Sequence, residues 1–290
     1  VVTDHAIDFI NRQKQDRPFF LFLGFKSPHG PRTDNSVPEE YRTLYENARS
    51  YPVPNTSVLP SYAEYKDSVD KMGGGLSSPL KEPRVIESNI KYMRHITALD
   101  KCTGRLIDAL DSSPHAGNTV VIFTSDNGFY LGEHRLGDKR SAYDESLRVP
   151  LIIRTPGDNA PAINDDMVLN LDLAPTIFSF AGIETHTDVK GRSLIPLLNG
   201  NTPGDWRTSF FYLYIAEPNF NTPTVLATRT KNAKLIIYPN YPEFNELFDL
   251  TADPYEVENL YGKHKYNDLQ RKLEAEHQSL KEDTEFEIVK

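Results

Sequence analysis

The first two hundred residues alternate between stretches of helical spacing and short runs in which nearly every position is apolar. Apolar residues recur at helical spacing over residues 3–14 and 85–110, which predicts two amphipathic helices. Apolar runs of strand length are typical of strands covered on both faces. They occupy residues 19–25, 118–124 and 149–154. A further helix is expected after Asp172, with the Asp172 side chain as its cap. This alternation of strands and helices predicts an α/β fold with a mostly parallel sheet.

The pattern changes after about Trp206. Apolar and polar residues then alternate over short segments separated by turns, which predicts a small antiparallel sheet. Its strands are expected at residues 210–215, 224–229, 234–238 and 246–250, and a charged helix is expected over residues 259–281. We therefore expect a large α/β domain at residues 1–204 and a small α+β subdomain at residues 205–290.

Composition and charge restrict the classes of protein to consider. Of the 290 residues, 38% are hydrophobic and 25% are charged, which are the proportions of a folded globular protein. The formal net charge of −9 disfavours binding to a nucleic-acid backbone, because such binding requires a basic surface. No apolar run reaches the about 18 residues that a membrane span requires. Cys102 is the single cysteine, so the chain forms no internal disulfide.

Polar side chains suited to catalysis follow two of the predicted strands. Lys26 and His29 come after the first strand, and Asp126 and Asn127 come after the second. In an open parallel sheet, ligands bind beyond the carboxyl ends of the strands. A carboxylate and an amide oxygen at adjacent positions suit Ca²⁺, which takes oxygen ligands. Lys139, in the loop that follows, can hold an anionic oxygen and stabilise charge that develops on it.

Each of these residues also has a plainer explanation. An Asp-Asn-Gly sequence after a strand is more often a simple turn, in which the aspartate bonds to backbone groups. His29 lies in a proline-rich loop and can be bonded only to the backbone, and Lys139 can be a surface lysine paired with a nearby carboxylate. Single residues therefore leave the function open, and an ordered series of motifs carries more weight.

Such a series covers nearly the whole chain. In chain order it comprises Phe19-Phe20-Leu21, Ser27-Pro28-His29-Gly30-Pro31, Thr124-Ser125-Asp126-Asn127-Gly128, Gly132-Glu133-His134, Asp138-Lys139-Arg140, Val149-Pro150-Leu151, Asp172-Leu173-Ala174-Pro175-Thr176, Gly191-Arg192-Ser193-Leu194 and Glu246-Leu247-Phe248-Asp249-Leu250. The order and spacing of these motifs resemble the carboxyl-terminal portion of the type I, formylglycine-dependent sulfatases. The segment Tyr212–Arg229 resembles that of bacterial N-acetylglucosamine-6-sulfatase-like and arylsulfatase-like glycan sulfatases.

The resemblance implies a fold and a set of residue roles. The implied fold is the alkaline-phosphatase-like α/β sandwich, with a mostly parallel central sheet that is incomplete here and a small antiparallel carboxyl-terminal subdomain. Asp126 and Asn127 are then calcium ligands. His29 contacts the sulfate or assists the leaving group, Lys139 holds a sulfate oxygen, and His134 meets the substrate.

The reaction implied by the resemblance is the removal of sulfate from a sulfated carbohydrate. Lys26 and Glu217 are further residues expected to contact the saccharide, and the family resemblance favours a periplasmic or secreted protein. Neither a nucleic-acid partner nor a membrane span is expected.

One part of the family pattern is absent from these residues. Type I sulfatases carry a Cys/Ser-x-Pro-x-Arg signature whose cysteine or serine becomes formylglycine, the nucleophile. Cys102-Thr103-Gly104-Arg105 lacks the proline and lies within a predicted helix, so it does not qualify. The simplest interpretation is that an amino-terminal sulfatase segment with this signature is missing. We then expect the chain to be inactive alone, and to aggregate or to pair with that segment.

Two other functions compete with this interpretation. A phosphodiesterase or phosphonate hydrolase of the same superfamily would use a pair of metal ions with more His and Asp ligands, whereas Asn127 and Lys139 favour one metal ion and sulfate. A non-catalytic glycan-binding fragment would be consistent with the missing nucleophile. Such a chain has little physical reason to keep His29, Asp126, Asn127 and Lys139 together after predicted strands.

Overall fold

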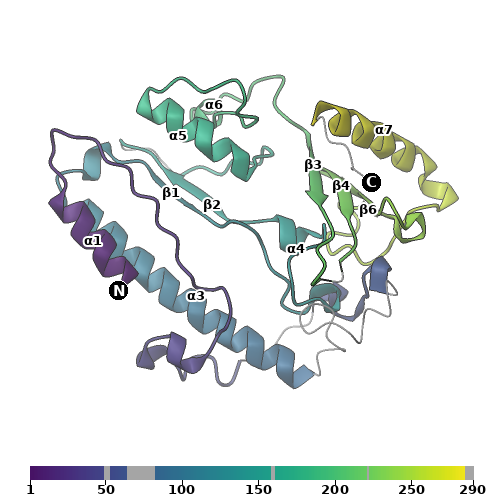
Figure 1. The fold of residues 1–290 in the computed structure, drawn as a ribbon, viewed down its shortest axis with the longest axis horizontal. Coiled ribbons are helices and arrows are strands. Elements are labelled where there is room, and N and C mark those ends of the chain that lie inside the picture. The colour runs from purple at the N-terminus through teal and green to yellow at the C-terminus, as the bar shows by residue number, and fades with distance from the viewer. Residues whose placement is uncertain (49–52, 64–81, 158–160, 221, 285–290) are drawn as a thin grey trace. The chain divides into compact units, whose positions relative to one another are not determined.

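The computed structural model describes residues 1–48, 53–63, 82–157, 161–220 and 222–284, without the side chains of residues 82–86. The chain forms two compact units (Figure 1). The first unit comprises Val1–Pro52, Ser78–Ser125 and Pro150–Ala160, and the second comprises Val53–Ser77, Asp126–Val149 and Pro161–Lys290. The boundary expected between residues 204 and 205 falls inside the second unit, and it stays a prediction.

Two helices that lie side by side make up much of the first unit. Helix α1 (Val2–Arg12) runs along helix α3 (Glu82–Asp111), and both were predicted from helical spacing (Figure 1). Ala6 and Ile10 of α1 are buried, as the amphipathic pattern requires. Single 3₁₀ turns follow at Asp34–Ser36, Glu39–Tyr41 and Ala116–Asn118.

The first unit contains one pair of strands among the residues that the structure describes. Strand β1 (Val121–Thr124) pairs with β2 (Leu151–Arg154) in an antiparallel register that places Thr124 opposite Leu151. Both strands were predicted, but the parallel pairing expected for them is not found. A parallel pair requires a long crossover connection, usually a helix. The connection Asp126–Val149 instead belongs to the second unit and contains only short helical turns.

The prediction of a strand at residues 19–25 is wrong for this structure. The segment forms no hydrogen-bonded ladder with any described residue, and the side chains of Phe20 and Phe22 are 67% and 84% exposed. Among the residues that the structure describes, aromatic neighbours of this segment contact only the ring of Phe19, with centroids 5.9 Å from Phe9 and 5.3 Å from His115. An apolar sequence favours a strand, but a strand also requires a neighbour for its backbone N–H and C=O groups.

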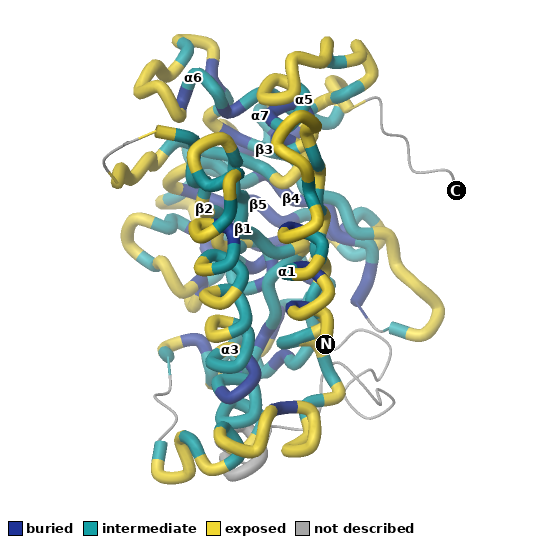
Figure 2. Tube along the Cα trace, turned by 90° about the vertical axis from the view of Figure 1, so that its left-hand side faces the viewer, coloured by how far each residue is buried: buried dark blue, intermediate teal, exposed yellow. Residues whose placement is uncertain are grey.

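A four-stranded antiparallel sheet lies at the centre of the second unit. Its strands are β3 (Ser209–Tyr214), β4 (Val225–Thr230), β5 (Ala233–Ile237) and β6 (Glu246–Asp249), and each pairs with the next along the chain. All four strands were predicted from the alternating pattern. Figure 2 shows buried residues on β3, β4 and β5, and Leu235, Ile236 and Leu247 have no exposed surface.

Helix α7 (Asn267–Asp283) packs against β3, β4 and β5, and its residue Leu273 belongs to the same core cluster as Leu247. The helix begins later than the predicted residue 259. Asn259 explains the difference, because its side-chain oxygen accepts the N–H groups of Leu247 and Tyr261 at 3.0 and 2.9 Å and holds this segment beside β6. Within the described ranges, no helix is both long and apolar enough to cross a membrane.

Short helical segments complete the second unit. They are α4 (Asp144–Leu147), α5 (Leu173–Ala181) and α6 (Ile195–Leu198), with 3₁₀ turns at Pro54–Ser57, Glu133–Arg135, Asn170–Asp172, Pro242–Phe244 and His264–Tyr266. Helix α5 begins after Asp172 as predicted, but the Asp172 side chain does not cap it. The fully buried carboxylate instead accepts the N–H groups of Leu169 and Arg192, each at 2.8 Å, and pairs with the guanidinium of Arg207.

Candidate functional site

Asn127 and Lys139 form the centre of the candidate site in the second unit. The ammonium Nζ of Lys139 donates a hydrogen bond to Oδ1 of Asn127 at 3.0 Å, and the Asn127 amide donates to the carbonyl of Gly128 at 2.6 Å. Both side chains are partly buried, whereas Asp126 is exposed. The backbone carbonyl of Asp126 accepts a hydrogen bond from the side chain of Asn170 at 2.9 Å. The structure thus brings Asn127 and Lys139, both candidates from the sequence, within hydrogen-bond distance of each other.

Ser146 of α4 forms hydrogen bonds to both segments that carry these residues. Its backbone carbonyl accepts the N–H of Gly128 at 2.8 Å, and its hydroxyl donates to the backbone carbonyl of Lys139. A Cβ at Gly128 would stand 1.9 Å from the carbonyl oxygen of Glu145, so this position accepts only glycine. The absence of a side chain at Gly128 thus permits the close approach of two backbone segments. No motif in the sequence singled out Ser146.

His29 and Lys26 lie in the first unit, in a turn closed by the hydrogen bond from the His29 N–H to the Lys26 carbonyl at 2.8 Å. Both side chains are exposed. Nδ1 of His29 lies 2.8 Å from the carbonyl of Gly30. A carbonyl only accepts, so Nδ1 carries a hydrogen, and Nε2 is the ring nitrogen that takes no part in this bond.

The buried imidazole of His95 on α3 anchors this turn. Its Nδ1 lies 3.2 Å from the hydroxyl of Ser27, and its Nε2 lies 3.0 Å from the hydroxyl of Ser36. Burial lowers the pKa of His95, with a further contribution from the charge of Arg32. The ring is therefore neutral near pH 7 and positions the turn without adding charge to it. Sequence reasoning missed His95 because one histidine on a helical face carries no motif.

Glu217 contacts Arg140, the residue that follows Lys139. Its carboxylate lies 3.2 Å from Nε of Arg140, whose guanidinium also pairs with Asp138 at 2.5 Å and lies over the ring of Phe220, 3.2 Å from the centroid. Half of the Glu217 side chain is exposed. The arrangement places a partly exposed carboxylate, a guanidinium and an aromatic face together, and these are groups that bind polar ligands.

His134 lies in the interior of the second unit, with 1% of its surface exposed. Its ring stacks on Tyr143 with centroids 3.8 Å apart, and its Nε2 lies 3.1 Å from Nδ2 of Asn55. Burial lowers the pKa of His134 to about 3, so the ring is neutral. The substrate contact expected for His134 has no support in this placement, because a buried ring with internal contacts cannot reach a ligand in solvent.

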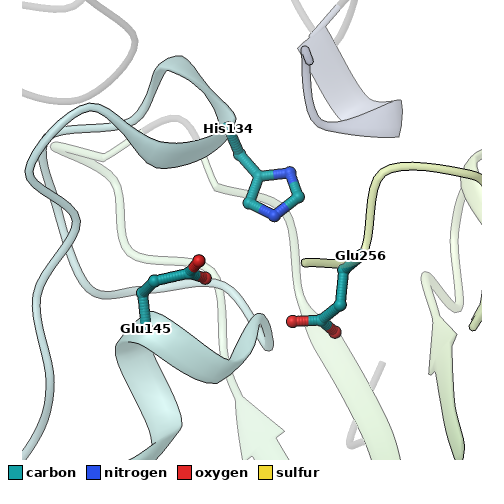
Figure 3. A group of neighbouring side chains, drawn as sticks. All are labelled: His134, Glu145 and Glu256. Carbon is teal, nitrogen blue, oxygen red and sulfur yellow. The ribbon is translucent and has the colours of Figure 1, made fainter. Parts of the chain in front are cut away.

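A second group of polar residues surrounds His134. Figure 3 shows its imidazole beside the carboxylates of Glu145 and Glu256, and one possible ligand atom from each of the three lies within 4.8 Å of the others. Glu256 also pairs with Lys234 at 2.5 Å. No sequence pattern indicated this group, because its members come from separate segments and share no regular spacing.

The oxygen atoms of Asp126 and Asn127 fit a hard divalent cation such as Ca²⁺ in their chemistry. Two residues are only part of the six to eight oxygen ligands that Ca²⁺ takes, so further ligands are required from elsewhere. Oδ1 of Asn127 already faces the ammonium of Lys139, which shows that this oxygen is directed toward positive charge. The residues present therefore fit as part of a calcium site.

Two family models match the chain. Residues 1–183 match the model described as Sulfatase, and residues 132–283 match the model described as N-sulphoglucosamine sulphohydrolase, C-terminal. Each match covers more than half of the 290 residues. Lys139 lies in both matched ranges, and Asn127 lies in the first.

Individual proteins give the same result. The chain is 30% identical over 330 residues to the N-acetylglucosamine-6-O-sulfatase of Bacteroides thetaiotaomicron, with 94% of this chain and 59% of that protein covered. It is also 30% identical over 296 residues to the multifunctional alkaline phosphatase superfamily protein PehA of Trinickia caryophylli, with 93% and 56% covered. The chain thus spans somewhat more than half the length of these two relatives.

A solved structure shares the fold. The structure of BT4656 in complex with its substrate D-glucosamine-2-N,6-O-disulfate superposes with a TM-score of 0.82 at 26% identity, covering 97% of this chain and 68% of that one. The expected alkaline-phosphatase-like α/β fold is confirmed by this similarity. Together with the two family models, it shows that this chain belongs to the sulfatase family.

Proposed function

We propose that this chain takes part in the hydrolysis of a sulfate ester on a sulfated carbohydrate. The observation that carries the proposal is the hydrogen bond of 3.0 Å from Lys139 to Asn127, in the segment that follows β1 and within the range matched by the Sulfatase model. An ammonium held beside an oxygen ligand set places positive charge where an anionic sulfate oxygen can bind. Positioned positive charge stabilises negative charge that develops during ester cleavage.

The individual residues then have separate roles. Asp126 and Asn127 would hold Ca²⁺, which when bound supplies positive charge that polarises a sulfate oxygen. Lys139 binds a sulfate oxygen through its ammonium. The carbonyl of Gly30 accepts the hydrogen on Nδ1 of His29. This leaves Nε2 as the nitrogen that exchanges a proton with the leaving-group oxygen.

The nucleophile of the proposed reaction lies outside these 290 residues. The printed sequence contains no Cys/Ser-x-Pro-x-Arg signature from which formylglycine could form. We propose that an amino-terminal sulfatase segment supplies it and that the chain alone does not turn over substrate. A preparation restricted to residues 1–290 should therefore release no sulfate, whereas addition of that segment should restore activity.

We propose a sulfated hexosamine as the substrate, and a periplasmic or secreted location. Two relatives support the sugar: one is an N-acetylglucosamine-6-O-sulfatase, and one structure contains D-glucosamine-2-N,6-O-disulfate. Lys26, which is exposed beside His29, would contact the anionic part of the saccharide, and Glu217 would accept hydrogen bonds from its hydroxyl groups.

A second candidate function is hydrolysis of a phosphate or phosphonate ester. It is favoured by the similarity to the structure of the phosphonate monoester hydrolase SpPMH from Silicibacter pomeroyi, which superposes with a TM-score of 0.72 at 25% identity and covers 88% of this chain and 54% of that one. The two candidates differ in the ester that is cleaved, and the same protein can be assayed for both. The test is sulfate release from N-acetylglucosamine 6-sulfate against cleavage of a phosphonate monoester, by the complete protein with and without added Ca²⁺. The proposal expects faster sulfate release that requires Ca²⁺, and preference for the phosphonate would overturn it.

A further inference from the structure

Three side chains of metal-ligating type converge inside the second unit, apart from the Asn127–Lys139 pair. In Figure 3 the imidazole of His134 and the carboxylates of Glu145 and Glu256 point toward one another, with possible ligand atoms within 4.8 Å. Only 1% of His134 and 2% of Glu256 are exposed, and Glu145 is partly buried. Buried carboxylates are unfavourable unless they are paired, protonated or bound to a metal ion.

The charged side chains around this group do not cancel. Lys234 pairs with Glu256 at 2.5 Å and with Asp144 at 2.6 Å, and Arg229 pairs with Asp144 at 2.9 Å. Glu145 forms no ion pair within the part of the chain that the structure describes. Three carboxylates thus surround two cations, and one negative charge is left over when His134 is neutral.

Buried oxygen atoms beside His134 lack hydrogen-bond partners among the described residues. They are Oε2 of Glu145 and Oδ1 of Asn55. Asn55 is fully buried, and its Nδ2 lies 2.7 Å from Glu145 Oε1 and 3.1 Å from His134 Nε2. Rotating this amide by half a turn, a choice fixed only by its hydrogen bonds, exchanges Nδ2 and Oδ1. The amide oxygen then faces both the carboxylate and the imidazole.

We propose that His134, Glu145, Glu256 and Asn55 bind a divalent transition-metal ion, for which Zn²⁺ is the best match. One imidazole nitrogen and three oxygen ligands form a four-coordinate set that suits Zn²⁺. The nitrogen ligand makes Ca²⁺ a poor match, since Ca²⁺ takes oxygen ligands. Ligands at about 2.1 Å from zinc stand about 3.4 Å apart, so the side chains would close by roughly 1 Å.

Lys234 weakens the binding of a cation at this site. Its ammonium already contacts Glu256, and it repels any cation bound between Glu256 and Glu145. Binding is favoured nevertheless because the metal ion supplies a partner to Oε2 of Glu145 and to the amide oxygen of Asn55, two buried atoms that lack a hydrogen-bond partner among the described residues. The proposed ion is structural: it ties α4, which carries Glu145, to the separate segments of Asn55 and Glu256. The inference is independent of the proposed sulfate-ester activity.

The experiment is zinc binding to the purified protein at constant pH 7, measured by calorimetric titration and by metal analysis after dialysis. We expect one Zn²⁺ per protein chain. We also expect a rise of several degrees in the unfolding temperature, because a ligand that binds only the folded state stabilises it. Glu145→Gln and His134→Gln should each weaken binding at least tenfold. The matched controls are Glu246→Gln and His277→Gln, which alter a buried carboxylate and a buried imidazole of the same unit outside the group.

An X-ray absorption spectrum of the zinc-loaded wild-type protein keeps the test independent of any variant that fails to fold. It should show one imidazole among oxygen ligands. Absence of zinc binding by the wild-type protein would overturn the proposal. So would retention of full affinity in Glu145→Gln and His134→Gln, or a spectrum with more than one imidazole, since each of these places the metal elsewhere.

Discussion

The backbone at Gly128 approaches Glu145 so closely that a Cβ at residue 128 would stand 1.9 Å from the Glu145 carbonyl oxygen. Gly128→Ala must therefore separate the segment after β1 from α4, and it breaks the hydrogen bond from Gly128 N–H to Ser146. We expect a loss of about 1 to 3 kcal/mol in the free energy of unfolding. Denaturant unfolding measures it.

Gly104→Ala is the matched control. Gly104 lies within α3, and a Cβ there meets nothing within 4 Å. Alanine in an exposed helical position should raise the free energy of unfolding by about 1 kcal/mol. Equal destabilisation by both substitutions would show that the close approach at Gly128 does not exist.

Ser146→Ala removes the hydroxyl that donates to the backbone carbonyl of Lys139. The loss should cost about 1 kcal/mol in stability and leave that carbonyl without this donor. Ser146 is a positioning residue, so we expect kcat for ester cleavage by the complete protein to fall several-fold with KM little changed. Ser179→Ala removes a comparable bond, from a hydroxyl to the carbonyl of Pro175, and should leave kcat intact. Equal kcat values for the two variants would contradict the positioning role of Ser146.

Asp172→Asn tests the buried ion pair that replaces the expected helix cap. The substitution keeps the shape of the side chain but leaves the guanidinium of Arg207 with a neutral partner. Breaking a buried pair in this way should cost about 3 to 5 kcal/mol. Asp205→Asn is the control, because Asp205 pairs with Arg192 at 3.0 Å but is 80% exposed, and such pairs contribute about 0 to 1 kcal/mol. Comparable losses, measured by thermal unfolding, would contradict the assignment.

Glu246 should make stability depend on pH. Its buried carboxyl accepts hydrogen bonds from Tyr143 and Tyr238 at 2.8 and 2.9 Å, but burial raises its pKa from 4.5 to about 7, with a further contribution from the charge of Glu256. Between these values the folded chain binds a proton that the unfolded chain has released. The contribution of Glu246 to stability is therefore full below pH 4.5 and is lost as pH rises through 7.

The expected loss across this window is about 3 kcal/mol, from roughly 1.4 kcal/mol per pKa unit. Glu246→Gln cannot titrate, so the difference in unfolding free energy between wild type and variant should change with pH between 5 and 8. Other groups, including His134, titrate in both proteins and cancel in that difference. A difference that stays constant over this range would show that Glu246 has an ordinary pKa.

The elements whose pattern is local could be predicted from the sequence. The helices near residues 3–14 and 85–110 and the four strands of the small sheet follow from spacing that each segment carries itself. The strand at residues 19–25 could not be decided in this way, because its existence depends on a neighbouring strand and not on its own apolar residues. The same holds for the antiparallel pairing of β1 with β2, which depends on the path of the connection between them.

The candidate site shows the same difference between local sequence patterns and contacts that depend on distant segments. Asn127 and Lys139 became candidates because they belong to motifs with fixed spacing, and the structure brings them within hydrogen-bond distance. Ser146 and His95 were missed, since a residue that positions another through one hydrogen bond leaves no pattern in the sequence. His134 belongs to a motif, yet its neighbours Asn55 and Glu256 come from distant segments, so its burial could not be foreseen.

The most direct test of the proposed function is kcat/KM for sulfate release from N-acetylglucosamine 6-sulfate by the complete protein with Lys139→Ala. If Lys139 stabilises charge on the sulfate, kcat/KM should fall by about 10²- to 10³-fold relative to wild type. Lys231→Ala, which removes an exposed lysine from the turn between β4 and β5, should leave it unchanged. An active wild-type protein whose Lys139→Ala variant retains full activity would contradict the account.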